Sequence, residues 1–201
     1  MAAPTPTASQ QSLATRRLLL EPRTVADNAS CFELDSDAEV VRFIAVPWAD
    51  EAEHKAFIEA RTRGPYPLGQ GYWTIRQKSE PTRFLGWILL MPLDAVGPEI
   101  EIGWRLRRDA WGAGLATEAA RAVLDNAFMI LALPEVVADI HPKNVRSIRV
   151  LEKNGFRREG LAERYLRIAG RWEDHVIFAT TSEEWAAGGR SPGASYTGGK
   201  R

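Results

Sequence analysis

The segment from Arg108 to Ala119 constrains the fold of this chain more than any other part of the sequence. A strand-like stretch, 99–107, runs into it, and a long helical pattern follows it. Gly112 and Gly114 let the backbone approach a ligand closely, because glycine has no side chain and tolerates positive φ. The N–H groups of the first helical turn, with the positive end of the helix dipole, form a site for phosphate or pyrophosphate. The sequence therefore predicts a nucleotide-like ligand at this strand–loop–helix junction.

Helix signals lie on both sides of this loop. After it, apolar side chains recur at helical spacing as far as Leu131. An Asp-x-x-Glu pattern that starts at Asp50 predicts the beginning of a helix that ends near Arg63. A shorter helix is expected after Asn144, with Gly155 just beyond its last turn.

Seven strands are expected before, between and after these helices. Residues 24–43 read as interrupted helical sequence, and Ala169-Gly170 is a two-residue hairpin turn signal. The order is therefore β-α-α-β-β-β-α-β-α-β-β, an α/β (α+β) arrangement. The expected strands are 17–23, 71–78, 83–91, 99–107, 135–141, 156–168 and 171–180.

Length and tail composition predict one domain. The chain has 201 residues, which is enough for a sizeable core. Residues 1–12 are rich in Ala, Pro, Thr, Ser and Gln, and residues 186–201 are rich in Gly and Ser. We expect both ends to be disordered tails and residues 13–185 to form the single working domain.

Charge and cysteine usage exclude several classes of partner. The 26 basic and 26 acidic side chains balance, which argues against binding to nucleic acid or to an anionic membrane. The N-terminus does not have the form of a secretory signal, and no apolar run approaches the ~20 residues that span a bilayer. Cys31 is the single cysteine, which excludes an internal disulfide and a Cys-rich metal site. These features predict a cytoplasmic protein without a metal.

Five segments, in order along the chain, resemble the GNAT superfamily of N-acetyltransferases, and within it the RimJ/RimL-like branch. They are Thr15–Leu20, like the opening strand; Phe84–Ile88, like the third strand; Glu99–Trp104, like the fourth strand; Trp111–Ala119, like the cofactor loop; and Asn144–Ser147 with Leu151–Phe156, like the second cofactor segment. The resemblance implies a mixed, mostly antiparallel central sheet of about seven strands, flanked by helices. In that sheet the fourth and fifth strands, 99–107 and 135–141, splay apart.

The resemblance also implies an activity, which is the transfer of an acetyl group from acetyl-CoA to a primary amine by direct attack in a ternary complex. The acceptor is then a protein N-terminus, an amino acid or another small amine. The loop amides would hold the coenzyme A pyrophosphate, the splayed strand would pair with the pantetheine arm, and Arg108 would neutralise a phosphate. The implied cofactor-binding residues are Trp104, Arg105, Leu106, Arg108, Trp111, Gly112, Ala113, Gly114, Leu115, Ala116, Thr117, Asn144 and Ser147.

Two positions depart from the general superfamily pattern. Trp111 stands where the loop usually has Gln or Arg, as is common in the RimJ/RimL-like branch. Leu151 stands where many members have a tyrosine that protonates the leaving thiolate. By resemblance to the branch, Ser147 is the candidate proton donor in its place.

Glu101 is the candidate catalytic base. Strand alternation places Glu99, Glu101 and Gly103 on one face, next to the expected co-substrate. A carboxylate there can accept the ammonium proton directly or through a water, especially if burial raises its pKa. Two alternatives stay open: a solvated carboxylate without a catalytic role, and proton loss through water. His141 ends a neighbouring strand, where a structural role is the simpler expectation.

Two other functional classes remain to be weighed. The missing tyrosine is compatible with a non-catalytic acyl-CoA-binding or regulatory module. A dinucleotide-dependent oxidoreductase is disfavoured, because the charged residues 107–109 separate the strand from the glycines. The sequence does not identify the acceptor amine, and it leaves both a monomer and a homodimer open.

Overall fold

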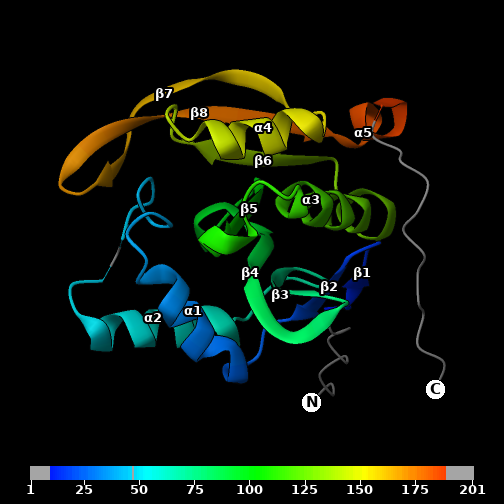
Figure 1. Cartoon of the computed structure of the whole chain (residues 1–201). Coiled ribbons are helices and arrows are strands. Elements are labelled where there is room, and N and C mark those ends of the chain that lie inside the picture. Colours follow the sequence, from blue (N-terminus) through cyan, green and yellow to red (C-terminus); the bar gives the residue numbers. More distant parts are fainter. Residues whose placement is uncertain (1–9, 47, 189–201) are drawn as a thin grey trace, which may run out of the picture.

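The structure is a computed structural model that describes residues 10–46 and 48–188. One eight-stranded sheet runs through the molecule in the order β1-β2-β3-β4-β5-β6-β8-β7 (Figure 1). The strands are β1 (Leu13–Ala14), β2 (Leu18–Pro22), β3 (Gly71–Gln77), β4 (Glu80–Pro92), β5 (Ile100–Leu106), β6 (Glu135–Ile140), β7 (Arg157–Ile168) and β8 (Arg171–Thr181). The helices are α1 (Asn28–Asp35), α2 (Glu51–Arg63), α3 (Leu115–Asp125), α4 (Val145–Lys153) and α5 (Ser182–Gly188).

The predicted mixed, mostly antiparallel sheet is confirmed, with one strand more than expected. All seven predicted strands are present, and the eighth is β1, which pairs with β2 through Leu13 and Leu20. Two residues are too few for a period-two pattern to show in the sequence. The predicted tails 1–12 and 186–201 lie outside the described residues, apart from residues 10–12 and 186–188.

Local capping explains where the helices begin and end. The Asp50 carboxylate accepts the backbone N–H of Glu53 at 2.9 Å, as its N-cap pattern predicts, and Gly64 closes α2 with a positive φ of 71°. The helix predicted to reach Leu131 is regular only to Asp125, and it then widens into a π-helical turn, Asn126–Ile130. Strand β4 begins at Glu80, three residues before the predicted start at residue 83.

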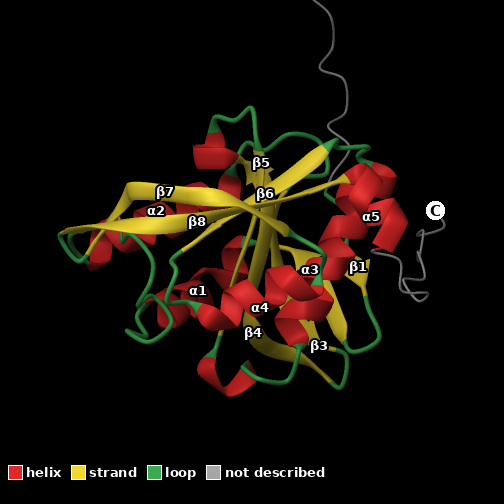
Figure 2. Cartoon of the chain, turned by 90° about the horizontal axis from the view of Figure 1, so that it is seen from above, coloured by secondary structure: helices red, strands yellow, loops and turns green. Residues whose placement is uncertain are grey.

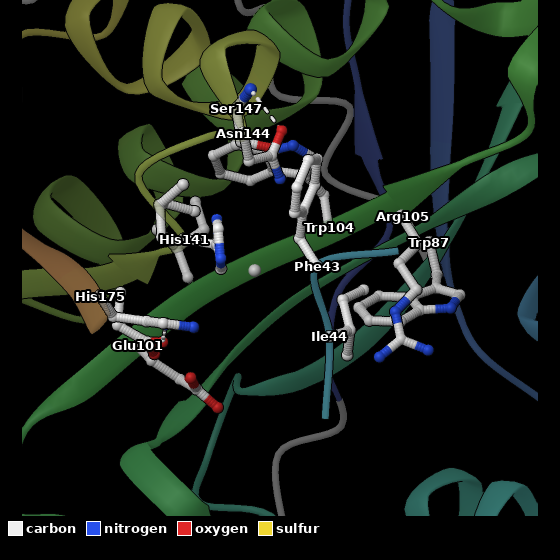
Figure 3. A pocket seen from close by; sticks show the side chains of 14 residues that line it. Phe43, Ile44, Trp87, Glu101, Trp104, Arg105, His141, Asn144, Ser147 and His175 are labelled. Carbon is white, nitrogen blue, oxygen red and sulfur yellow. Dashed lines mark hydrogen bonds and ion pairs between the residues drawn. The ribbon is translucent and has the colours of Figure 1, made fainter. Parts of the chain in front are cut away.

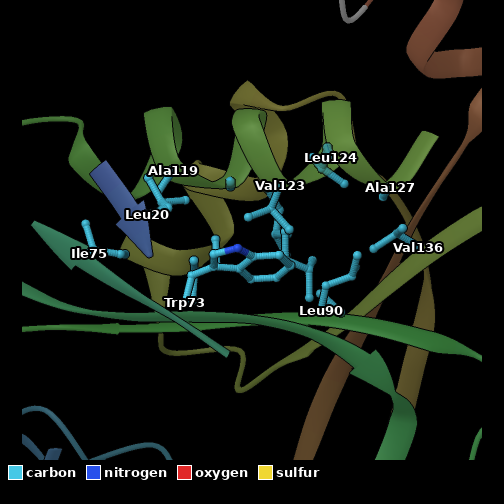
Figure 4. Packing of buried hydrophobic residues seen from close by; sticks show 14 of the residues in the cluster. Leu20, Trp73, Ile75, Leu90, Ala119, Val123, Leu124, Ala127 and Val136 are labelled. Atoms are coloured by element: carbon cyan, nitrogen blue, oxygen red, sulfur yellow. The ribbon is translucent and has the colours of Figure 1, made fainter. Parts of the chain in front are cut away.

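The two faces of the sheet carry separate apolar cores. Helices α3, α4 and α5 cover one face, where Trp73 lies fully buried beneath α3 among Val123, Leu124 and Leu20 (Figure 4). Helices α1 and α2 cover part of the other face. There the buried side chains are Cys31, Leu34, Ile58, Tyr72, Phe84, Trp87, Leu89 and Met91.

The neighbouring strands β5 and β6 separate after a single backbone-paired residue pair. Strands β4 and β5 are antiparallel from Gly86↔Leu106 to Pro92↔Ile100, whereas within the described residues β5 and β6 form one parallel pair, Glu101↔Val137. The predicted splay between these two strands is therefore confirmed. It leaves the β6-facing backbone edge of β5, beyond Glu101, without a strand partner.

Gly86 is required by the close approach of β4 and β5. Its φ is +147°, and a Cβ atom built on it would lie 2.1 Å from the backbone O of Arg105. That neighbour is backbone in the strand that borders the splay, so it cannot move aside without disturbing the register.

We therefore expect Gly86→Ala to lower the free energy of unfolding by about 2–4 kcal/mol, because it adds both backbone strain and a steric clash. Urea denaturation followed by circular dichroism measures this change. Gly160→Ala is the matched control, since a Cβ on this strand glycine meets no atom within 4 Å. Equal stability of the two variants would contradict this account of Gly86.

Candidate active site

A cavity opens where β5 and β6 part. Its walls come from β5, the end of β6, the start of α4, the segment after α1, and β8. In Figure 3, Asn144 and Ser147 gather at one end and Glu101 and His175 at the other. The lining residues are Phe43, Ile44, Trp87, Glu101, Ile102, Gly103, Trp104, Arg105, Asp139, Ile140, His141, Asn144, Ser147 and His175.

The glycine loop has the geometry of an anion site. Gly112 and Gly114 adopt positive φ values of 77° and 74°, and Gly114 is the N-cap of α3. The first helical hydrogen bond runs from the N–H of Glu118 to the C=O of Gly114. The amides of residues 115–117 precede it and have no acceptor within the helix. A Cβ on Gly112 would meet no protein atom within 4 Å, so the loop surface is open at this point.

The N-terminal segment holds this loop in place. Glu118 accepts the hydroxyl of Thr15 at 2.5 Å, the backbone N–H of Arg17 at 2.8 Å and the Arg17 Nε–H at 2.6 Å. The Arg17 guanidinium also donates to the backbone O of Ala113 at 2.9 Å. Although burial raises it, these hydrogen bonds and the Arg17 charge hold the pKa of Glu118 below its ordinary value.

Trp111 connects the loop to the end of β5. Its indole N–H donates to the backbone O of Leu106 at 2.8 Å, and the Arg146 guanidinium lies 4.6 Å from its ring centroid. The residue that replaces the usual Gln or Arg therefore acts here through packing and one hydrogen bond. It fixes the distance between the loop and the unpaired edge of β5.

The first turn of α4 brings Asn144 and Ser147 to the cavity wall. The Asn144 side-chain oxygen accepts the backbone N–H of Ser147 at 3.3 Å, so Asn144 is the predicted N-cap. Leu151 is 1% exposed and belongs to the core beneath α4. Apolar packing therefore accounts for the leucine at the usual tyrosine position, and the hydroxyl of Ser147 lies one turn closer to the cavity.

Glu101 lies at the point where the strands part. It lines the cavity, and burial, with the negative charges of Asp139 and Asp94, raises its pKa from 4.5 to about 7. The charge of Arg61 opposes this rise. A carboxyl group with this pKa is both a competent proton acceptor and substantially ionised near neutral pH.

The two arginines of the predicted set are engaged in ion pairs. Arg108 Nε lies 2.7 Å from Asp37 Oδ2, and its side chain is mostly exposed beside the start of the loop. Arg105 contacts the Asp35 carboxylate at 2.7 Å and lies over the Trp87 ring. A phosphate at Arg108 would therefore compete with Asp37, while the Arg105 side chain is held on the far side of β5 from the loop.

Three aromatic residues, Trp48, Tyr66 and Trp73, do not line the cavity. Trp73 is in the core under α3, Trp48 stacks on His54 with ring centroids 3.8 Å apart, and Tyr66 packs near Tyr72. Trp172 is 55% exposed. It lies near the turn of the β7–β8 hairpin, which extends past β6 toward the side that carries α2 (Figures 1 and 2).

Sequence reasoning missed the part of the cavity that β6 and β8 contribute. Asp139 and His175 line it, and their side chains meet at 2.5 Å. The residues are far apart in the chain, and only the strand register shows that they are neighbours. Phe43, from the segment predicted as interrupted helix, stacks on His141 with ring centroids 4.9 Å apart and forms another wall.

Cys31 has no part in this site. It is fully buried in the core under α1, and burial raises its pKa to about 11. Among the described residues, no group of three or more His, Cys, Asp or Glu side chains is arranged to hold a metal ion. No helix in the same part of the chain is long and apolar enough to cross a bilayer.

Comparison with known proteins places this geometry in a family. Residues 17–157 match the Acetyltransferase (GNAT) domain. A probable N-acetyltransferase of Bacillus subtilis, YjcK, is 46% identical over 39% of this chain, a match that spans 43% of its own length. An uncharacterized N-acetyltransferase of the same organism, YnaD, is 28% identical over 86% of this chain and 98% of its own. The crystal structure of a GNAT-family acetyltransferase from Bacillus anthracis superposes with a TM-score of 0.73, at 26% identity, over 86% of this chain and 99% of that one.

The contacts beneath the loop generate a prediction about ligand affinity. Glu118→Gln replaces one of two acceptor oxygens with an NH₂ group that faces the donors on Thr15 and Arg17. We expect the dissociation constant for acetyl-CoA to rise about 5- to 10-fold, which corresponds to about 1 kcal/mol, the net contribution of one ordinary hydrogen bond. Calorimetric titration measures this change.

Glu39→Gln is the control for this measurement. It also removes a carboxylate, from an exposed pair with Arg42 at 3.7 Å, and it should leave the affinity unchanged. An unaltered dissociation constant in Glu118→Gln would show that the loop does not need its support from the N-terminal segment.

Proposed function

Because this chain belongs to the GNAT acetyltransferase family and transfers an acetyl group from acetyl-CoA to an amine, we propose that the reaction takes place in the cavity beside Glu101. In this proposal Glu101 takes a proton from the acceptor. The observation that carries it is the position of Glu101: a buried carboxyl with a pKa of about 7, at the single residue pair where β5 and β6 part.

The co-substrate fits the surfaces on the other side of the cavity. The loop amides from Gly112 to Thr117 suit the pyrophosphate, since they are helix N-terminal donors beside left-handed glycines. The free backbone edge of β5 near Trp104–Leu106 suits the amide groups of pantetheine, which pair as a strand would. Asn144 and Ser147 border the same space, and of the assigned residues that line the cavity Ser147 is the one with a hydroxyl group, which suits it to protonate the thiolate.

The charge around Glu101 favours an acceptor that arrives as an ammonium ion. The carboxyl groups of Asp139 and Asp94 add negative potential to that of Glu101. A cationic amine gains from this field before reaction and loses the gain after acetylation removes its charge. Product release is favoured by the same arrangement.

Membership of the RimJ/RimL-like branch is part of the proposal. It is supported by Trp111 in the loop, by the buried Leu151 and by Ser147 at the cavity wall. The buried, non-reactive Cys31 is compatible with the reducing conditions of the cytoplasm, where we place the protein. A homodimer stays a prediction.

A non-catalytic acyl-CoA-binding module is the competing function. It would bind acetyl-CoA through the same loop and would need no ionisable carboxyl at the splay. Calorimetry with acetyl-CoA, with NAD in parallel, tests the ligand. Thiol release with an alanine-initiated tetrapeptide amide, free alanine, spermidine and phenylethylamine then tests catalysis. Binding of acetyl-CoA without amine-dependent thiol release from any of these would favour the module.

Glu101→Gln separates catalysis from binding. We expect kcat/KM to fall about 100-fold or more, while acetyl-CoA affinity stays within twofold, because the amide cannot accept the proton. In the wild type, kcat/KM should rise with pH and level off above about 7, as Glu101 ionises. The variant should lose this ionisation from its pH profile.

The same substitution should affect stability in the opposite direction. The pKa of Glu101 is higher in the folded protein than in the unfolded chain, so its neutral form stabilises the fold and its ionised form does not. Relative to Glu101→Gln, the wild type should lose up to about 3 kcal/mol of unfolding free energy as the pH rises from 4.5 to above 7. If the Glu101→Gln enzyme has the rate and the pH profile of the wild type, Glu101 is not the proton acceptor.

A further inference from the structure

A second ionisable pair faces the acceptor side of the cavity. His175, on β8, is 3% exposed, and its Nδ1 lies 2.5 Å from Asp139 Oδ1 on β6. Its other nitrogen, Nε2, is buried and has no hydrogen-bond partner among the described residues. Both residues line the cavity that also holds Glu101 (Figure 3).

The contact with Asp139 decides which nitrogen carries the proton. An ionised carboxylate only accepts hydrogen bonds, so the proton of a neutral His175 lies on Nδ1 and the lone pair lies on Nε2. That lone pair is on a buried, unpartnered nitrogen of a ring that lines the cavity. A base held by a carboxylate, with its other nitrogen unpartnered in a ring that lines the cavity, is an arrangement that promotes proton abstraction.

The neighbouring His141 lacks this property. Its Nδ1 accepts the backbone N–H of Lys143 at 3.1 Å, and its Nε2 faces the Glu173 carboxylate at 3.4 Å. Both ring nitrogens are therefore occupied, although the ring lines the same cavity. The groups that face His175 are Asp139 and His141 on and just after β6, Tyr165 on β7, and Glu101 on β5; Glu173 shares its own strand.

Acetylation of an ammonium acceptor requires two proton losses from one nitrogen. The first converts the ammonium into the nucleophilic amine. The second accompanies formation of the C–N bond and cleavage of the C–S bond. One of these protons ends on the sulfur of coenzyme A, and the other passes to water. A single carboxyl group cannot take both protons within one turnover unless it releases the first in between.

We propose that His175, held by Asp139, is a second proton acceptor in this cavity and takes one of the two protons, Glu101 taking the other. The inference rests on the proposed function, since it assumes that the acceptor nitrogen lies between the two groups. Asp139 then has two effects: it orients the imidazole of His175 and stabilises the imidazolium that forms.

The pH dependence of kcat/KM tests this, with the amine from the panel above that gives the fastest thiol release. If both groups must be unprotonated, the logarithm of kcat/KM should rise with a slope approaching two at low pH. His175→Gln should lower kcat/KM about 10- to 100-fold and reduce that slope to one, with acetyl-CoA affinity within twofold of the wild type. Asp139→Asn should give a smaller loss in the same direction.

His54→Gln is the matched control. His54 is also buried and also lies against a carboxylate, Asp35 at 3.5 Å, but it does not line the cavity. Its removal should change stability without changing the slope of the pH profile. Added imidazole should restore turnover to His175→Ala in a saturable manner, an effect that a purely structural histidine would not show.

The outcomes separate the two proposals. A His175→Gln enzyme with the rate and slope of the wild type would overturn the role of His175 and leave the proposed function standing. A folded His175→Ala protein that imidazole does not rescue would also overturn it. Absence of amine-dependent thiol release from the wild type would instead overturn the proposed function.

Discussion

The candidate active site depends on one interruption of backbone pairing. Strands β5 and β6 touch at Glu101↔Val137 and then diverge, whereas β5 remains fully paired with β4 on its other side. Backbone groups within a sheet are normally satisfied by a neighbouring strand, so an unpaired edge in the middle of a sheet is costly unless another group bonds to it. The divergence therefore creates the cavity and leaves a backbone edge to which an extended ligand or water can bond, and it places the carboxyl group of Glu101 where the two strands part.

The parts around this opening are held by contacts that reach across the chain. Glu118 ties the loop to Thr15 and Arg17, about one hundred residues earlier, and Trp111 ties it to the end of β5. Asn144 fixes the first turn of α4 on the opposite side. Because these contacts are partly buried and join the loop to neighbouring segments, the loop amides are oriented before a ligand arrives, which reduces the entropy lost on binding.

Much of this architecture can be predicted from the sequence, and the features that cannot be predicted share one cause. The glycine loop, the caps at Asp50 and Asn144, and seven strands follow from local spacing and from motifs. The short β1, the π-helical turn at Asn126–Ile130 and the exposed Trp172 do not, because tertiary packing decides them. Likewise Glu101 belongs to a recognisable strand motif, whereas Asp139 and His175 become neighbours only through the register of β6 and β8.

The two halves of the cavity differ in how much they contribute to the packing of the core. The loop and β5 side rests on the core beneath α3, while the acceptor side includes Phe43 and Ile44 from the segment after α1 and His175 from the β7–β8 hairpin, whose edge strand β7 is largely exposed. Segments that carry little packing accept substitution at small cost in stability. Evolution can therefore exchange one acceptor for another in this scaffold while the machinery that holds the acetyl donor is preserved, which makes the molecule readily evolvable toward new amines.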